Sequence, residues 1–308
     1  MTSARWWVYQ RERFPVVAHG ALILAFSASA VALSSLLRRE WPTAAAFAVA
    51  FASAFLFFLQ LRVCDEFKDA DEDRRHRPYR PVPRGLVTLA ELARLGVAAA
   101  VVQVLLALWL DLRLLVVLVG VWVYMALMAR EFFAAEWLKA RPFTYLWSHM
   151  LVVPLVDLYA TACDWLPVAT GPAVLPPAGL TWFLLASFFN GVVVEIGRKL
   201  RAPMDEEAGV ETYSAVWGRP KAVAGFLIAL VLAAVSATMA GRAVGASTAV
   251  ATCGAFALLA STVIASGYLH APATGAGKRF EVLSGLWTLA MYVSVGILPL
   301  TLQWWAAR

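Results

Sequence analysis

The sequence predicts an all-α, polytopic membrane protein with about nine transmembrane helices. Of its 308 residues, 61% are hydrophobic and 15% are charged, and the mean hydropathy is +0.71. A water-soluble chain of this length would carry much more charge. Apolar windows of roughly 20 residues, enough to cross about 30 Å of hydrocarbon, recur along the whole chain. We therefore expect a single integral membrane domain over residues 1–308.

The expected spans are joined by short loops, except after the second and the sixth. They lie near 16–37, 42–64, 88–110, 113–132, 143–163, 178–197, 221–241, 246–270 and 283–305. With the N-terminus inside, most of the 26 Lys and Arg residues fall in inner segments. This asymmetry predicts a multi-pass protein of the inner, cytoplasmic membrane, with the N-terminus and both long charged loops on the cytoplasmic side.

The net charge of +6 therefore reflects topology, and no nucleic-acid partner is expected, because the basic residues lie at membrane ends without a binding module. Cys64, Cys163 and Cys253 lie in different spans without CxxC or Cys/His spacing. That spacing predicts neither a zinc site nor a disulfide framework. The histidines are scattered, and for His149, which lies within a span, a functional role stays open.

The first long loop opens with an acidic segment, residues 65–73. Asp65, Asp69 and Asp73 recur every four residues and would share one helix face, with Glu66 beside them. Like charges at this spacing repel one another, so a divalent cation is a natural reason to tolerate them, and carboxylate oxygens suit Mg²⁺. The alternative is a solvated loop that is rich in both signs of charge.

The second long loop follows a span that ends with acidic and basic residues together. Asn190, Glu195, Arg198 and Lys199 lie near one helix end, where the acid can hold a metal and the cations can meet phosphate oxygens. Charges at the end of a span need a partner or an aqueous cavity. Elsewhere, Lys139 and Arg141 precede an inner helix start, where they are either phosphate contacts or an ordinary basic flank.

At the first acidic segment the chain resembles the UbiA superfamily of intramembrane prenyltransferases. That family has an Asn-Asp pair, then Asp at the third and seventh positions beyond the paired Asp, then Arg-Pro-x-Pro-x-Gly. Here Asp65 and Glu66 take the places of the pair, Asp69 and Asp73 follow, and residues 80–85 read Arg-Pro-Val-Pro-Arg-Gly.

The second segment departs from the family's second Asp-rich motif. Glu195 takes the first place of that motif, and Arg198 or Lys199 falls where another Asp is usual. These two cations could themselves bind diphosphate in place of a second metal ion, or the protein could use a different phosphorylated substrate.

The resemblance implies a bundle around a central cavity, in which Mg²⁺ helps an isoprenyl diphosphate to ionise. The expected metal ligands are Glu66, Asp69, Asp73 and Glu195. The expected catalytic residues are Asp65, which would orient or deprotonate the acceptor, and Arg80, Arg198 and Lys199, which would stabilise the developing charge. The expected substrate contacts are Asn190, Arg80, Lys139, Arg141, Arg198 and Lys199.

The predicted function is Mg²⁺-dependent transfer of an isoprenyl group from a prenyl diphosphate to an aromatic or other small hydrophobic acceptor, within membrane lipid. A terpene cyclase of the same fold, which needs no acceptor, is one alternative. A membrane transporter is another, but transporters usually place their binding groups near the midplane, whereas these charges cluster at one surface.

Overall fold

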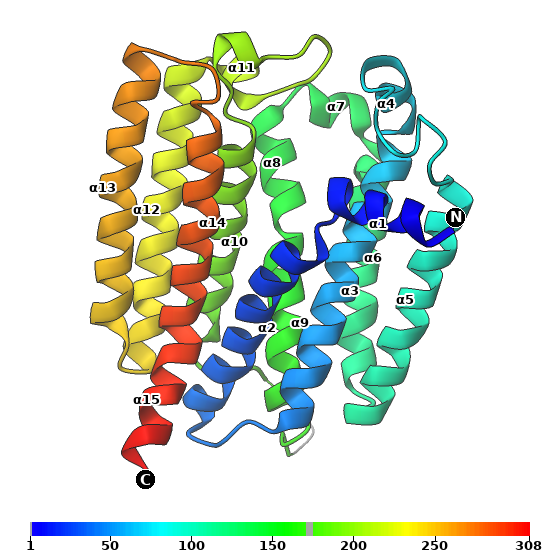
Figure 1. The fold of residues 1–308 in the computed structure, drawn as a ribbon. Coiled ribbons are helices and arrows are strands. Elements are labelled where there is room, and N and C mark those ends of the chain that lie inside the picture. The colour runs from blue at the N-terminus through cyan, green and yellow to red at the C-terminus, as the bar shows by residue number, and fades with distance from the viewer. Residues whose placement is uncertain (1, 171–174) are drawn as a thin grey trace.

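The computed structural model describes residues 2–170 and 175–308, and every regular element in these ranges is a helix. The helices form an elongated bundle that is roughly parallel to one axis (Figure 1). The spanning helices are α2 (Val16–Arg38), α3 (Ala44–Lys68), α5 (Leu89–Leu110), α6 (Leu114–Ala129), α8 with α9 (Pro142–Met150 and Val152–Trp165), α10 (Leu180–Arg198), α12 (Arg219–Ala243), α13 (Ser247–His270), and α14, the π-helix η3 and α15 (Lys278–Tyr292, Val293–Ile297 and Leu298–Ala306).

The expected fold class is confirmed. Eight of these spans are long and apolar enough to cross a membrane, and α6, with 16 residues, supplies a shorter ninth apolar helix among the described residues. Their boundaries follow local chemistry. Thr43 caps α3 by accepting a hydrogen bond from the Ala46 amide, and Thr88 forms a capping box with Glu91 at the start of α5. These caps fix where α3 and α5 begin.

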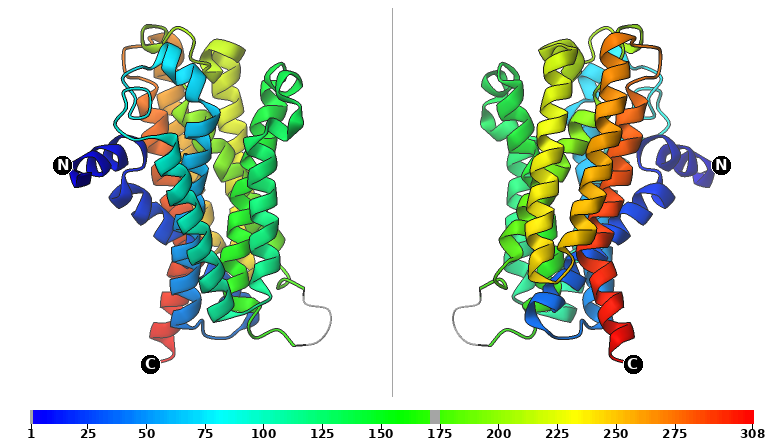
Figure 2. Two further views of the ribbon diagram at one scale, coloured as in Figure 1. Left: turned by 90° about the vertical axis from the view of Figure 1, so that its right-hand side faces the viewer. Right: turned by 90° about the vertical axis from the view of Figure 1, so that its left-hand side faces the viewer.

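The short helices connect the spans and extend from the bundle. They are α1 (Thr2–Arg13), α4 (Ala70–His76), η1 (Glu131–Phe133), α7 (Ala135–Lys139), η2 (Pro203–Asp205) and α11 (Tyr213–Trp217). Helices α4, α7 and α11 lie at one end of the bundle (Figure 1), and α1 projects from its side (Figure 2). Tyr9 of α1 is buried with Val63, Val87 and Leu92, which ties α1 to α3 and α5.

Small residues bring the spans close together, as is usual where lipid leaves little hydrophobic drive for helix association. Gly197 shows this directly beside the second charged segment. A Cβ added there would lie 2.1 Å from Ser284 Oγ of α14 and 3.1 Å from the Phe280 carbonyl oxygen. The resulting contact between α10 and α14 positions the end of α10, and with it the charged residues that follow Gly197.

Candidate active site

The first acidic segment lies at the end of α3 and in α4. Helix α3 stops at Lys68 and α4 starts at Ala70, but i to i+4 backbone hydrogen bonds continue across the junction. The Asp69 amide donates to the Asp65 carbonyl at 2.9 Å, and the Asp73 amide donates to the Asp69 carbonyl at 2.8 Å. Asp65, Asp69 and Asp73 therefore keep the four-residue spacing that places them along one side of the chain.

Two carboxylates of this segment are buried in ion pairs. Glu66 is 2% exposed and accepts a hydrogen bond from Arg13, the last residue of α1. Asp73 is also 2% exposed; it lies 2.6 Å from Arg80 and 3.0 Å from Arg77. A buried carboxylate needs such a partner, because an unpaired charge is costly to desolvate. Arg80, which was predicted to contact substrate, is thus paired in this structure with Asp73, a predicted metal ligand.

The electrostatic environment of Asp69 differs from that of Glu66 and Asp73. Burial raises the pKa of Asp69 above the usual value, and the neighbouring carboxylates Asp65, Asp73 and Glu72 raise it further, against a smaller opposing effect of Lys68. Among the described residues, Asp69 has no salt-bridge partner within 4.0 Å, while Asp65 lies 3.5 Å from Arg62 and is 42% exposed. Asp69 is therefore the one carboxylate of residues 65–73 without a cationic partner among the described residues.

The second charged segment, at the end of α10, has the opposite balance. Glu195 has a side chain only 9% exposed, and it lies 2.6 Å from Arg198 and 2.9 Å from Lys199. Both cations retain more exposure than the acid between them, at 45% and 37%. They can therefore contact a further anion while holding Glu195. Asn190 lies deeper in the bundle, where Thr288 donates a hydrogen bond to it at 3.2 Å.

The two segments face each other. Asp65 and Arg198 are close enough to interact electrostatically, and Tyr145 of α8 is within electrostatic range of both Asp69 and Glu195. The loops beyond the two segments also meet, because a Cβ on Gly209 would come within 2.5 Å of the His76 ring. With its φ of +77°, Gly209 also has a backbone conformation that favours glycine. Together the loops form one polar end over an apolar bundle.

A third group of polar side chains lies beside the first segment and consists of Lys68, Glu131, Tyr145 and His149. Lys68 Nζ lies 2.5 Å from Glu131 Oε1 and 3.4 Å from His149 Nε2, and it also donates to the Tyr145 hydroxyl. The Tyr145 hydroxyl donates to Glu131 Oε1 at 3.1 Å, and the Tyr145 and His149 rings stack at 3.9 Å. Burial alone would raise the pKa of Glu131, but contacts with His149 and Lys68 lower it to about 2.

Lys139 and Arg141 remain at the surface of this end of the bundle. Both are exposed, and the Arg141 guanidinium lies 4.5 Å from the Trp137 ring centroid and donates to the Trp137 carbonyl at 3.2 Å. No salt bridge joins either residue to a carboxylate among the described residues. Their position fits both interpretations offered by the sequence, a basic flank and a phosphate contact.

The arrangement fits one divalent cation better than two. Across residues 2–170 and 175–308, no group of three or more His, Cys, Asp or Glu side chains comes together as a metal site. Mg²⁺, however, is commonly held by one or two carboxylates together with substrate phosphates and water. Asp69 has no cationic partner among the described residues, and Asp65 precedes it by one helical turn, so these two carboxylates could hold one such ion. Glu195 does not offer such a ligand, because Arg198 and Lys199 already neutralise it.

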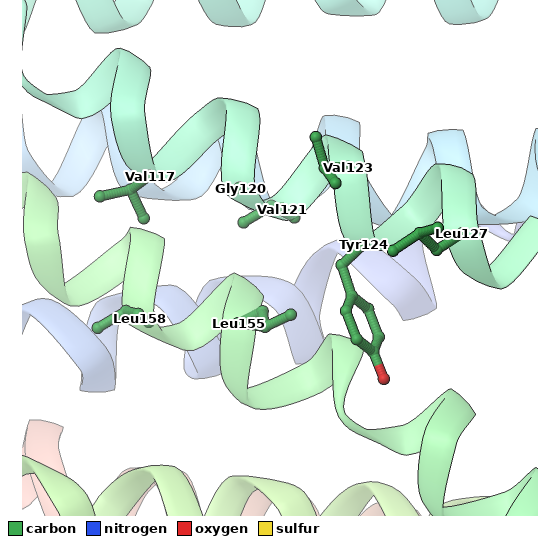
Figure 3. A pocket seen from close by; sticks show the side chains of 8 residues that line it. All are labelled: Val117, Gly120, Val121, Val123, Tyr124, Leu127, Leu155 and Leu158. Atoms are coloured by element: carbon green, nitrogen blue, oxygen red, sulfur yellow. The ribbon is translucent and has the colours of Figure 1, made fainter. Parts of the chain in front are cut away.

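An apolar cavity of about 290 Å³ lies between α6 and α9 (Figure 3). It is lined by Val117, Gly120, Val121, Val123, Tyr124, Leu127, Leu155 and Leu158. Tyr124 is its only polar lining side chain, and the Tyr124 hydroxyl donates to the Ser148 carbonyl at 2.5 Å, next to His149. The lining suits an apolar group, and the Tyr124 ring packs edge-on against Phe132 of η1.

Sequence reasoning did not include Arg13, Lys68 or Glu131 among the candidate site residues. Arg13 looked like a basic flank, and Lys68 like one cation of a mixed loop. The sequence offers one indication of this group: Glu131 lies just after an apolar helix, as Glu195 lies near the end of another. Its pairing with Lys68, which is distant in sequence, depends on the tertiary fold.

Comparison with known proteins identifies a family. The model of the UbiA prenyltransferase family matches residues 21–276. Among curated protein sequences, none matches the chain.

Solved structures share the fold. A UbiA homologue from Aeropyrum pernix K1, in its apo state, superposes with a TM-score of 0.65 at 16% identity, over 93% of this chain and 98% of the other. A UbiA homologue from Archaeoglobus fulgidus bound to DMAPP and Mg²⁺ gives 0.55 at 14% identity, over 93% and 98%. A digeranylgeranylglyceryl phosphate synthase gives 0.57 at 15% identity, over 90% and 98%.

Proposed function

Because the chain belongs to the UbiA prenyltransferase family, we propose that it moves an isoprenyl group from a prenyl diphosphate to an aromatic or other small hydrophobic acceptor, with Mg²⁺ as cofactor. One observation carries this proposal: an uncompensated carboxylate, Asp69, and an exposed cation pair, Arg198 and Lys199, occupy the same polar end of an apolar bundle. That combination suits a metal–diphosphate headgroup with an apolar tail. DMAPP and Mg²⁺ in the Archaeoglobus relative support it.

In the proposed site, Asp69 and Asp65 hold one Mg²⁺, and Arg198 and Lys199 contact the diphosphate directly. Bound Mg²⁺ would supply Lewis-acid stabilisation of the departing pyrophosphate. Glu195 pairs with both cations. These ion pairs hold the two side chains at the end of α10 and restrict their rotamers. Their fixed positive charge stabilises the negative charge that develops as the carbon–oxygen bond of the substrate breaks.

The other residues predicted from the sequence have supporting roles in the proposed site. Glu66 and Asp73 would join the metal only by exchanging their arginines, Arg13 and Arg80, for the cation. Asn190 lines the deeper part of the substrate path, and Lys139 and Arg141 supply positive charge near its entrance. The apolar helices keep water away from the allylic cation. We further propose that the polar end faces the cytoplasm, as the basic residues of its loops predict.

The direct test is incubation of the purified protein with C10 to C20 and longer prenyl diphosphates, with and without Mg²⁺, while pyrophosphate and organic products are measured. Mg²⁺-dependent release with prenylation of an added acceptor is the expected result. Release that yields a hydrocarbon or alcohol regardless of acceptor would favour a cyclase. No release, even with membrane extract as a source of acceptors, would contradict the proposal and favour transport.

A further inference from the structure

We propose that the protein binds one anionic phospholipid on its lipid-facing side, with the phosphate at the connection between α6 and α8 and an acyl chain in the cavity between α6 and α9. This site lies apart from the two charged segments. The inference concerns the binding of a lipid of the surrounding leaflet, so it does not depend on prenyl transfer.

The cavity between α6 and α9 opens toward the outside of the bundle (Figure 3). Val123, one of its lining residues, is 54% exposed, and Gly120 on the same helix is also exposed. A Cβ added at Gly120 would meet no atom within 4 Å. Leu155 and Leu158 of α9 form the opposite, apolar wall. Around a spanning helix the apolar material is lipid, so the group that suits this opening is a hydrocarbon chain.

Helix α6 places a cation at the end of the same side. Val123, Leu127 and Arg130 follow one another at spacings of four and three residues, which puts them on one side of the helix. Arg130 is the C-cap residue of α6, and it is exposed. No carboxylate of the described residues lies within 4.0 Å of its guanidinium. A chain that lies along this side of α6 therefore brings its headgroup to a guanidinium that no protein carboxylate neutralises.

The length of α6 sets the depth of Arg130 in the membrane. The helix has 16 residues, which span about 24 Å at 1.5 Å per residue. The hydrocarbon core is roughly 30 Å thick. The end of so short a span stays close to the boundary between acyl chains and headgroups, and a long basic side chain there extends to the phosphates. Arg130 thus lies at the depth of the lipid phosphates.

The connection from α6 to α8 supplies two more cations. Lys139 and Arg141 are exposed, and the only other exposed ionisable side chain between them and Arg130 is the carboxylate of Glu136. The Arg141 guanidinium is held in place, because it lies 4.5 Å from the Trp137 ring centroid and donates to the Trp137 carbonyl at 3.2 Å. A guanidinium positioned in this way can donate its remaining N–H groups to a phosphate as a pair.

Exposed aromatic rings accompany these cations. Phe133, Trp137 and Phe143 are 76%, 50% and 61% exposed, and aromatic rings at the end of a span are typical of the membrane interface. The turn that presents Phe133 is strained, because Glu131, Phe132 and Phe133 have φ values of 49°, 51° and 58° without a glycine among them. Such strain persists where surrounding contacts impose it. A lipid packed against Phe133 supplies a contact of this kind on the exposed side.

The charges of this connection select a phosphodiester instead of a diphosphate with its metal ion. Glu131 is buried and engaged by Lys68, which leaves Glu136 as the one exposed carboxylate, and Mg²⁺ requires oxygen ligands. A phosphodiester carries a single negative charge, which the three cations can neutralise without a metal. A zwitterionic headgroup adds a positive charge that these cations repel. The lipid that fits is therefore anionic.

The test titrates the purified protein with phosphatidylglycerol or with phosphatidylcholine of the same acyl chains, and bound lipid is counted by native mass spectrometry. We expect one phosphatidylglycerol to bind at least about tenfold more tightly than phosphatidylcholine. The double variant Arg130→Gln with Arg141→Gln should lower this affinity by about tenfold or more, as expected for loss of charge-assisted hydrogen bonds. Arg279→Gln, an exposed arginine at the start of α14, is the matched control and should leave the affinity unchanged.

Gly120→Leu tests the acyl-chain part of the site. The leucine side chain would occupy the cavity without meeting protein atoms at its Cβ, so the affinity for phosphatidylglycerol should also fall by about tenfold. Gly267→Leu is the matched control, because Gly267 lies in the spanning helix α13, is exposed and likewise has no atom within 4 Å of an added Cβ. Glycerol 3-phosphate, which has the phosphate but no chain, should not displace the lipid.

Equal affinity for the two lipids in the wild type would overturn the inference, as would an affinity for phosphatidylglycerol that either the double variant or Gly120→Leu leaves unchanged. Displacement of the lipid by geranyl diphosphate without Mg²⁺ would also overturn it, because the site would then belong to the substrate. If the double variant does not fold, judged by monodisperse elution and thermal unfolding, Gly120→Leu decides the matter. Because the readout is bound lipid, none of these outcomes depends on turnover.

Discussion

The two charged segments occupy equivalent places, each at the end of a span and at the same end of the bundle, yet their electrostatics are opposite. At the end of α3, carboxylates are in excess, and Asp69 has a raised pKa because burial and the neighbouring acids disfavour its charge. At the end of α10, one buried carboxylate, Glu195, is shared by Arg198 and Lys199. The first segment thus has a carboxylate without a cationic partner among the described residues, and the second has two cations around one carboxylate.

This difference shows how one substrate headgroup can be held in two ways. A diphosphate can reach the acidic segment only through a cation that bridges like charges, whereas Arg198 and Lys199 can bind it directly. We therefore expect the first segment to depend on Mg²⁺ and the second to be independent of it. Substitutions in either segment test this contrast.

Asp69→Asn should have the largest effect. Loss of the bridging carboxylate removes the metal, so pyrophosphate release should fall by at least about 100-fold. Stability without Mg²⁺ should not fall, because the substitution removes a carboxyl group whose charged form is disfavoured by burial and by the neighbouring carboxylates, which together raise its pKa. Turnover and thermal unfolding measure both effects. Asp71→Asn is the matched control, since the Asp71 side chain is 82% exposed and its carboxylate pairs with the neighbouring Arg74. Normal turnover in Asp69→Asn would exclude Asp69 as a ligand.

Lys199→Gln should weaken substrate binding without abolishing the response to Mg²⁺. A charge-assisted hydrogen bond contributes about 1.5–3 kcal/mol, so the KM for prenyl diphosphate should rise roughly tenfold to a hundredfold. Steady-state kinetics at several Mg²⁺ concentrations measure this change. Lys221→Gln, an exposed cation at the start of α12, is the control. If KM stays constant while the Mg²⁺ requirement rises, the cation pair does not bind diphosphate.

Arg13→Gln tests the ion pair that encloses Glu66. Because the Glu66 side chain is 1% exposed, removal of Arg13 leaves a buried carboxylate without its partner. Breaking a buried pair typically costs about 3–5 kcal/mol. The Tm in detergent should fall by several degrees, and the double variant Arg13→Gln with Glu66→Gln should recover most of the loss. No recovery in the double variant would mean that the loss does not come from an unpaired Glu66.

Much of the fold could be predicted from the sequence, because a membrane span is a local property. Apolar length and positive flanks located all the spans within a few residues, including the ends of α3 and α10. The four-residue spacing of Asp65, Asp69 and Asp73 was likewise visible, since helical geometry alone relates them.

The partners of these charges could not be predicted in the same way. Arg13 meets Glu66, and Lys68 meets Glu131, only because separate helices converge at one end of the bundle. The left-handed turn at Glu131 has no sequence signature, since neither Gly nor Asn occurs in it. Whether a given acid is uncompensated, as at Asp69, or neutralised, as at Glu195, is therefore a property of tertiary structure.

The smallest expected effect is on stability in acid. Glu131 has a pKa of about 2 in the folded protein, below its ordinary value of 4.5. A lowered pKa stabilises the fold fully above the ordinary value, and this stabilisation is lost as the pH falls toward the folded value. Between pH 4.5 and about 2, the Tm of the wild type should therefore fall more steeply than that of Glu131→Gln. Parallel curves would show that Glu131 is not held by Lys68 and His149.

The most direct test of the contrast is a count of bound metal ions. Mn²⁺ replaces Mg²⁺, and its binding to the purified protein is titrated by electron paramagnetic resonance in the presence of a thiolodiphosphate analogue that does not ionise readily. We expect one ion per chain in the wild type and in Glu195→Gln, and none held tightly in Asp69→Asn. Two ions per chain in the wild type, with one lost in Glu195→Gln, would contradict the account, because Glu195 would then be a metal ligand.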